Sequence, residues 1–323
     1  FFFVLTAIII VTILTAILFS RWFTRPIEKL TSAMGKIYEE NFFQVFTKRK
    51  DELGDLIHVF NSMVKKLKEI KERNETISRL KTQFVSVAAH QLRTPLSAVK
   101  WTMKILLDGE LGKLSDEQKK FLNSGYESNE RMIRLVNDLL NVSRIEEGKF
   151  SFKFSEVEFE PFLKDTINEI SLLAREKKIT IQVQNLINES LKIVADPSRL
   201  KLAVSNVLDN AVRYSRPNNT ITVVLTKEDE FLQVVIQDTG IGIPEDEIDK
   251  VFTRFFRASN AIKAHTEGSG LGLFITRNII ARHGGTTGFY SEEGKGFTFT
   301  FTLPLRKELI PENVSVEKFL EAV

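Results

Sequence analysis

The sequence predicts a multidomain chain with a transmembrane helix, two helical-bundle regions and an α+β domain of two layers. Three observations support this prediction. Residues 1–20 carry no charge, residues 21–148 repeat apolar side chains at helical spacing, and short β-branched runs alternate with helical stretches after Lys149. A chain of 323 residues also exceeds what one hydrophobic core usually holds.

The composition argues against several classes of function. The 45 Lys and Arg residues and the 42 Asp and Glu residues are interspersed and leave a net charge of only +3. This balance argues against nucleic-acid binding. The chain has no cysteine, which excludes disulfides and cysteine-based metal sites.

Residues 1–20 are long enough to cross a membrane, because a helix of that length spans roughly 30 Å. The features of a signal peptide are not visible here, and a buried core helix is the other alternative. Arg21, Trp22, Arg25 and Lys29 follow directly, and an aromatic and basic edge is typical of the cytoplasmic side. We therefore expect a span at 1–20 in the cell (inner or plasma) membrane, with the chain after about residue 21 in the cytoplasm.

Residues 21–73 contain two short amphipathic helices on either side of a loop at 41–50. Their apolar faces are narrow, so each helix needs partners. The segments RPIEKL and DELGDLIHVFNSM resemble a HAMP signal-relay domain, which implies a parallel four-helix bundle formed by two chains. A plain coiled-coil stalk is the alternative.

Residues 74–148 predict a helical hairpin. The first arm runs to about residue 108, the pattern breaks at Gly109 and Gly112, and the second arm starts at Ser115. Both arms carry an apolar seam. Pairing two hairpins would bury the seams in a four-helix bundle, so we expect a homodimer.

Residues 149–305 predict the α+β domain, one sheet backed by helices. The tail at 306–323 is expected to be partly disordered, with at most a weak short helix. Within the domain we expect strands at 179–184, 220–226, 231–237 and 297–303, and helices near 160–177 and 197–214.

The run AAHQLRTPLSAVK sets His90 and Thr94 side by side on one helix face, since they are four residues apart. Pro95 has no N–H for the carbonyl of Gln91, and its ring crowds that carbonyl. We expect the helix to be loosened there. An exposed imidazole at this point is a candidate nucleophile.

Four later segments, DNAVRY, DTGIGIP, GSGLGL and GKGFTF, together indicate a nucleotide pocket. Asn206 and Asn210 lie one turn apart, and Arg213 continues their face. The amide oxygen of Asn210 suits Mg²⁺, which keeps waters and phosphate oxygens as its other ligands. The guanidinium of Arg213 can neutralise phosphate charge. Asp238 follows an apolar strand and can accept a hydrogen bond from an adenine amino group, although a plain Asp-Thr-Gly turn is an alternative.

With the further segment LLNVSRIEEGK, these motifs resemble in order and spacing a two-component sensor histidine kinase with a Bergerat-type (GHKL) ATP-binding domain. The resemblance covers nearly the whole chain. It implies autophosphorylation of His90 from ATP and Mg²⁺, then transfer of the phosphoryl group to an aspartate of a response-regulator receiver domain. It also assigns Asn206 to the metal–phosphate neighbourhood, Tyr214 to the phosphate wall and Asp238 to base recognition.

The glycines of these motifs have expected tasks. Gly240 and Gly242 are expected to adopt positive φ values and to let the backbone approach the base. GSGLGL is expected to open a helix whose free N–H groups face the triphosphate. The stretch 257–267 lacks an apolar period, which favours a mobile lid over ATP. The binding residues expected in GSGLGL are Gly268, Gly270, Leu271 and Gly272.

Three positions depart from the family pattern or add to it. Gln91 stands where the family usually has Glu or Asp, and an amide can orient the imidazole but cannot take its proton. We expect a slower autokinase, and the alternative is a catalytically silent ATP-binding scaffold. Thr94 matches a position that orients a water, which implies phosphatase activity toward the regulator. Phe297 replaces a usual small hydroxyl residue, with an expected effect on local packing only.

The other histidines are expected to have no chemical role. His58 should lie on the surface or in the seam. His265 should be a solvated lid residue, and a contact with phosphate is the alternative. His283 lies near a helix end, where a cation would favour the helix dipole.

Overall fold

The computed structural model describes residues 2–38, 42–187, 191–265 and 268–311. The chain divides into two units, Phe1–Lys81 and Thr82–Val323, and each unit has its own apolar core. Most of the tail expected at 306–323 lies outside the described residues. Its described part contains a short 3-10 turn, η3 (Lys307–Leu309).

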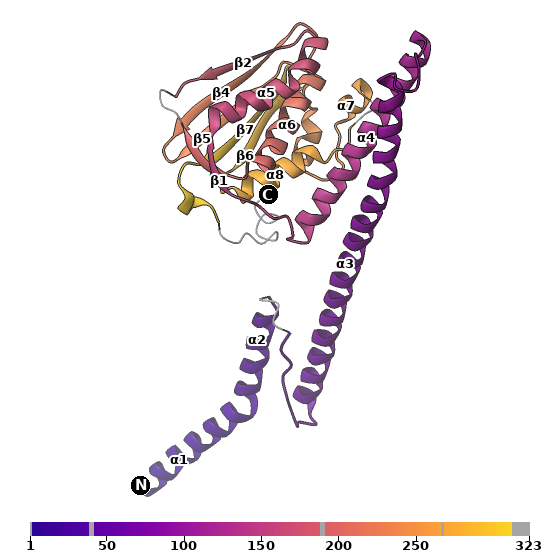
Figure 1. Cartoon of the computed structure of the whole chain (residues 1–323). Coiled ribbons are helices and arrows are strands. Elements are labelled where there is room, and N and C mark those ends of the chain that lie inside the picture. The colour runs from indigo at the N-terminus through magenta and orange to yellow at the C-terminus, as the bar shows by residue number, and fades with distance from the viewer. Residues whose placement is uncertain (1, 39–41, 188–190, 266–267, 312–323) are drawn as a thin grey trace. The chain divides into compact units, whose positions relative to one another are not determined.

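The first unit begins with an uninterrupted helical stretch (Figure 1). Helix α1 (Phe2–Phe19) passes through a π-helical turn, η1 (Ser20–Thr24), into α2 (Arg25–Tyr38). No side chain of α1 is buried. By length and composition alone, this stretch is long and apolar enough to cross a membrane.

A small core joins α2 to the start of α3. The segment 42–50, which has no helix or strand, connects them. The side chain of Asn61 fixes this segment, because it accepts from the N–H of Val45 and donates to its carbonyl, both at 2.9 Å. The buried residues of the core are Leu30, Ala33, Val45, Ile57, Phe60 and Val64.

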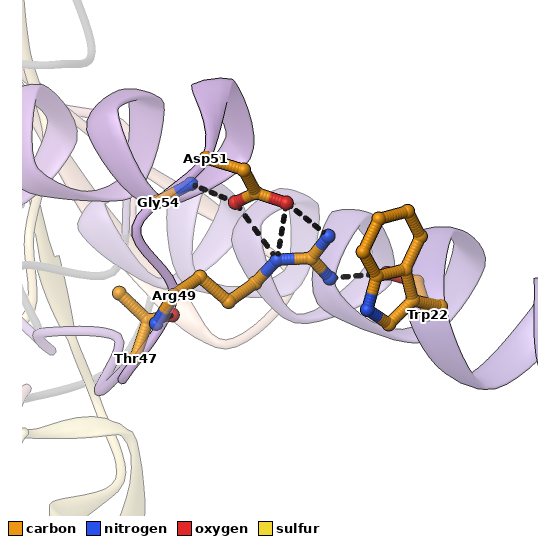
Figure 2. A network of polar contacts seen from close by, with 5 residues as sticks. All are labelled: Trp22, Thr47, Arg49, Asp51 and Gly54. Carbon is orange, nitrogen blue, oxygen red and sulfur yellow. Dashed lines mark hydrogen bonds and ion pairs between the residues drawn. The ribbon is translucent and has the colours of Figure 1, made fainter.

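Arg49 and Asp51 link the end of this segment to the turn after α1 (Figure 2). Nε and Nη2 of Arg49 lie 3.0 and 2.5 Å from Oδ2 of Asp51, and Nη1 donates to the carbonyl of Trp22. The Arg49 guanidinium also covers the Trp22 ring, 4.6 Å from its centroid. Asp51 accepts from the N–H of Gly54 at 3.1 Å and so caps α3. The hydrogen bond from Arg49 lowers the pKa of Asp51 to about 2.

Helix α3 (Glu52–Leu107) is one helix of 56 residues, where the sequence suggested two. No glycine or proline lies between Gly54 and Pro95 to end it. Ion pairs one turn apart lie on its surface near residue 74, for example Lys71–Glu75 at 3.8 Å. The boundary expected between residues 73 and 74 stays a prediction, and it falls inside this helix. The helix also continues through Pro95.

Helices α3 and α4 (Asp116–Glu146) form the expected hairpin. Ser115 caps α4 in a reciprocal arrangement with Gln118, which accounts for the start of the helix there. Ala89 of α3 packs against Val136 and Leu140 of α4. Three polar contacts then fix the register, namely Arg93–Asn137 at 2.5 Å, Asn129–Leu96 carbonyl at 2.9 Å and Ser143–Thr82 carbonyl at 3.2 Å.

The rest of the second unit contains a five-stranded sheet in the order β2-β4-β5-β7-β6. Strands β2 and β4 are parallel, and the other neighbours are antiparallel. Alternate residues of β4 and β5 are buried, which gives each strand a core face. The strands are β2 (Thr180–Asn185), β4 (Thr220–Glu228), β5 (Phe231–Gln237), β6 (Thr287–Glu292) and β7 (Gly296–Pro304).

Helices α5 (Phe159–Glu176), α6 (Pro197–Tyr214) and α8 (Gly272–Arg282) pack side by side against this sheet (Figure 1). The prediction missed β6, whose outer position and Gly288 weaken its alternation. It also missed a small separate ribbon of β1 (Ser155–Glu158) and β3 (Lys192–Ala195), whose strands have only four residues each.

His283 corrects one expectation. It follows α8, but it is fully buried and burial lowers its pKa, so the imidazole is neutral and is no cation for the helix dipole. Its Nδ1 lies 2.8 Å from the carbonyl of Ile279, and its Nε2 accepts from the N–H of Asp196 at 3.0 Å. His283 therefore ties the end of α8 to the start of α6.

Candidate functional site

A cavity of about 600 Å³ lies where the expected nucleotide segments meet. Its walls come from α6, the loop after β5, the loop before α8 and helix α4 of the hairpin. Nine of the expected binding residues line it, namely Asn206, Asn210, Arg213, Tyr214, Asp238, Gly242, Gly268, Gly270 and Gly272.

Helix α6 presents its polar face to this cavity because its apolar face is buried. The buried positions repeat at helical spacing, and Asn206, Asn210 and Arg213 fall on the opposite side. The amide of Asn206 donates to the carbonyl of Gly272 at 3.3 Å, which ties α6 to α8. Asp209 holds Arg213 at 3.1 Å.

Every one of the last four carbonyls of α6 has a partner, which an ordinary helix end lacks. The carbonyl of Ala211 accepts from Ser215, and that of Tyr214 accepts from the N–H of Ile241 at 3.3 Å. Nζ of Lys177 donates to the two between, the carbonyls of Val212 at 3.2 Å and Arg213 at 2.7 Å.

Lys177 is a positioning residue that no sequence pattern indicated. It lies just after α5, 35 residues before Val212 and 36 before Arg213, whose carbonyls it binds. Burial, and then the neighbouring Arg213, lower its pKa. Because Lys177 fixes the end of α6, it fixes the backbone that carries Arg213 and Tyr214.

Asp238 is the most perturbed acid in the described cavity. It is 6% exposed, and its Oδ1 accepts from the N–H groups of Gly240 at 2.8 Å and Phe297 at 3.2 Å. Burial raises its pKa to about 6, although these two hydrogen bonds oppose the rise. Oδ1 is thus occupied by the backbone, while the carboxylate lines the cavity.

Gly240 and Gly242 have different reasons to be glycine. Gly242 has φ +60°, and a side chain there would collide with the carbonyl of Glu292. Gly240 does not have the expected positive φ and does not line the cavity. The expected positive φ of Gly240 is therefore wrong, while its expected approach to the base stays a prediction. Glycine is required there because a Cβ would collide with the carbonyl of Tyr214.

The loop before α8 carries one expected residue and one addition. The side chain of Leu271 is fully buried in the core and does not line the cavity, and its expected contact with the cofactor stays a prediction. Ser269 does line it, and its hydroxyl donates to Oδ2 of Asp138 on α4 at 3.0 Å. Burial raises the pKa of Asp138. Helix α8 begins at Gly272, so its first-turn N–H groups start at the cavity wall.

The expected lid is partly helical. Helix α7 (Ser259–Ala264) lies within it, while Thr266 and Glu267 lie outside the described residues. Arg257 donates to the carbonyl of His265 at 2.5 Å, and Asn260 donates to the carbonyl of Gly242 at 3.0 Å. The ring of His265 is half-buried against Tyr214, with centroids 5.8 Å apart, so His265 is not simply a solvated residue.

Phe297 was expected to affect local packing only, and that expectation stays a prediction. It lines the cavity, and its N–H donates to Asp238. Its ring stacks on Phe289 at 5.5 Å. A large apolar wall therefore stands beside the acid.

His90, Gln91 and Thr94 are all exposed on α3, and none of them lines the cavity. The contacts of Arg93 with Asn137 and of Ala89 with Val136 set His90 at the level of residues 136–141 of α4. Several residues of that stretch are part of the cavity wall. The structure thus brings the two expected groups of residues to the same level of the hairpin without joining them.

The donors present would suit a magnesium ion carried by a nucleotide. Among the described residues, no three His, Asp and Glu side chains cluster as a metal cage. The cavity offers the Asn210 amide with Asn206 one turn away. That set fits Mg²⁺, which takes few protein ligands and keeps water and phosphate oxygens.

Three family models match the chain in succession. They are the HAMP domain over residues 18–69, the His Kinase A (phospho-acceptor) domain over 80–148, and the histidine kinase-, DNA gyrase B- and HSP90-like ATPase over 195–307. The chain belongs to the two-component sensor histidine kinases. The ATPase match supports ATP binding by the C-terminal domain of this kinase.

Relatives agree with this family. The sensor histidine kinase WalK of Bacillus subtilis (strain 168) is 32% identical over 268 residues, which are 82% of this chain and 42% of WalK. The aerobic respiration control sensor protein ArcB of Escherichia coli (strain K12) is 32% identical over 246 residues, 76% of this chain and 31% of ArcB. The chain therefore spans less than half the length of these relatives.

A solved structure agrees as well. Full-length ShkA in complex with AMPPNP matches with a TM-score of 0.57 at 28% identity, covering 69% of this chain and 45% of ShkA. The nucleotide analogue belongs to that structure.

The raised pKa of Asp238 predicts pH-dependent nucleotide binding. Above about pH 6 the group is a carboxylate and a strong acceptor, whereas protonation below that value weakens it. An Asp238→Asn variant should bind ATP roughly ten- to a hundredfold more weakly and should lose this pH dependence. Titration calorimetry across pH 6 measures both effects.

The same variant should not lose stability. The folded pKa lies above the unfolded value of about 3.9, so the buried charge opposes folding above pH 6 and is relieved as pH falls through 6. Asparagine removes the charge and can still accept from Gly240 and Phe297. Asp246→Asn, at an exposed acid, is the matched control and should bind normally. Unaltered affinity in Asp238→Asn would contradict base recognition by Asp238.

Proposed function

We propose that the chain is part of a membrane-anchored, homodimeric sensor kinase that phosphorylates its own His90 from ATP. The phosphoryl group then passes to an aspartate on the receiver domain of a response regulator. The observation that carries this proposal is the convergence of nine expected nucleotide residues on one cavity, at the level of the exposed histidine.

Binding in this cavity would use the residues according to their chemistry. Asp238 accepts from the adenine amino group, with Phe297 beside it as an apolar wall. Arg213 and the first-turn N–H groups of α8 neutralise the phosphates. Mg²⁺, bound with ATP, would be held by the Asn210 amide near Asn206 and would supply charge neutralisation.

The chemical step forms one bond and breaks one. An imidazole nitrogen of His90 attacks the terminal phosphorus, the bond from that phosphorus to the bridging oxygen breaks, and ADP leaves. Such transfers depend on positioning and charge neutralisation, because their transition state is loose. His90 must enter the cavity for this step, since α4 and not α3 lines it here.

Gln91 can orient the imidazole by accepting a hydrogen bond from its other nitrogen. It cannot accept the proton, which leaves to water or to a phosphate oxygen. A silent ATP-binding scaffold is less well supported than a slow kinase, because the cavity retains Asn210, Arg213 and Asp238 together.

A second copy of the chain would cover the apolar face of the hairpin. Large apolar side chains are exposed along both helices of this single chain. Paired hairpins would bury them as a four-helix bundle. The exposed set includes Leu80, Phe84, Val87, Leu92, Val99 and Phe121.

Replacing the histidine tests the phosphoacceptor. His90→Gln should abolish labelling by γ-labelled ATP, and the wild-type label should be acid-labile and base-stable as expected of phosphohistidine. His58→Gln, at another exposed histidine of α3, is the control and should be labelled normally. Labelling of His90→Gln at the wild-type level would refute the proposal.

Restoring an acid tests the role of Gln91. Gln91→Glu should autophosphorylate faster, because general-base assistance is worth on the order of 10²–10⁴-fold. Gln83→Glu, on the same helix and also exposed, controls for the added charge. The measurement is the initial rate of label incorporation. Equal rates for wild type and Gln91→Glu would contradict the proposal that Gln91 slows autophosphorylation.

Thr94 is proposed to orient a water against the phosphorylated regulator. Thr94→Ala should therefore dephosphorylate the regulator more slowly while it still phosphorylates His90. Thr102→Ala, also exposed two turns later on α3, is the control. The phosphatase role fails if Thr94→Ala releases phosphate from the purified phosphorylated regulator at the wild-type rate.

A further inference from the structure

The segment 42–50 contacts Trp22, which lies just after the apolar run 1–20. Arg49 donates to the carbonyl of Trp22 and covers its ring (Figure 2). Trp22 comes two residues after Ser20, where the uncharged run ends. Tryptophans at the ends of membrane spans lie at the level of the lipid headgroups. Arg49 therefore brings the end of this segment to that level, although 27 residues separate the two in sequence.

Side chains in this segment alternate between two sides. Val45 is buried, and Thr47 and Arg49 are half-buried, whereas Lys48 and Lys50 are exposed. An extended chain directs successive side chains to opposite sides. The two lysines therefore flank Arg49 and point away from the small core. Within the described part of the chain, neither has an ion-pair or hydrogen-bond partner.

Positive charge dominates at this level. Arg49 and Asp51 neutralise each other, so they add no net charge. The remaining cations are exposed and come from both sides of the Trp22 contact, whereas the nearest remaining acid on the segment side is Glu52. These cations are Arg21, Arg25, Lys48 and Lys50.

We propose that Lys48 and Lys50, with Arg21 and Arg25, bind the headgroups of anionic lipids, so that the segment 42–50 docks on the bilayer surface. Anionic lipids are the partner that fits, because the exposed side chains are cations and the Trp22 contact holds them at the level of the headgroups. The proposal rests on the membrane span of the proposed function. Each basic side chain near an anionic surface favours the docked state about fivefold.

Docking would act on the start of α3. Asp51 caps that helix and is held by Arg49, the residue between the two lysines. Lipid charge next to the two lysines would therefore act on the Arg49 contacts, which join Trp22 after the span to Asp51 at the start of α3.

The test measures the distance of the segment from the bilayer. The chain has no cysteine, so Phe46→Cys, at an exposed position on the same side as the lysines, gives a single site for a nitroxide label. The labelled chain is placed in nanodiscs that contain a nickel-chelating lipid, and nickel relaxes the nitroxide only when it is near the headgroups. Discs of phosphatidylcholine are compared with discs of phosphatidylcholine and phosphatidylglycerol.

Phosphatidylglycerol should increase the relaxation, and added salt should reduce it again. Lys48→Gln combined with Lys50→Gln should lower the ratio of docked to undocked segment by roughly 25-fold. The matched control is Lys65→Gln with Lys68→Gln, which removes the same charge from exposed positions further along α3 and should keep the response.

Two results would overturn the lipid contact, namely relaxation that does not depend on phosphatidylglycerol, or an equal loss in the control pair. A chain that does not co-elute with the discs would instead refute the span itself, and the lipid contact with it. The two failures are therefore distinguishable.

Discussion

The candidate site depends on helix α6 being fixed at both ends by other parts of the chain. At its start, Asp196 caps the helix by accepting from the N–H of Arg199, and its own backbone N–H donates to Nε2 of buried His283. At its end, Lys177 and Ile241 satisfy the carbonyls that a helix terminus normally leaves to water. The polar face that carries Asn206, Asn210 and Arg213 consequently has little freedom to shift. Positioning of this kind is what phosphoryl transfer requires of a protein.

The cavity beside α6 combines a destabilising feature with its function. A carboxylate in an apolar setting opposes folding, and Phe297 and the surrounding sheet provide that setting for Asp238. Two backbone N–H groups offset part of the penalty through Oδ1. Close backbone contacts at Gly240 and Gly242 make that arrangement possible, because any side chain would push the loop away from Tyr214 or Glu292. The acid therefore remains at the cavity wall, where the proposed recognition of a base would use it, at some expense in stability.

Local patterns in the sequence predicted what depends on local order. The apolar period of 197–214 gave the bounds of α6 and the shared face of its two asparagines, and the alternation at 231–237 gave β5. Contacts between distant segments carry no such pattern. Lys177, His283 and the Ser269–Asp138 hydrogen bond join elements far apart in the chain, and only the fold brings them together. The motif around Leu271 likewise does not indicate that the start of α8 turns this side chain into the core.

Helix α3 runs from just after the Arg49–Asp51 ion pair to beyond the candidate phosphoacceptor, His90, and no helix-breaking residue lies between Gly54 and Pro95. Between Gly54 and Pro95 every residue can continue the helix, and the structure has one helix over this whole stretch. Pro95 is the first position that lacks a backbone donor, and it comes directly after Thr94. Helix loosening by proline is therefore confined to the turn that presents His90 and Thr94, because every residue between Gly54 and Pro95 has a backbone N–H. Helix α3 therefore continues without a break from its cap at Asp51 to the turn at Pro95, where the missing backbone donor makes bending easiest.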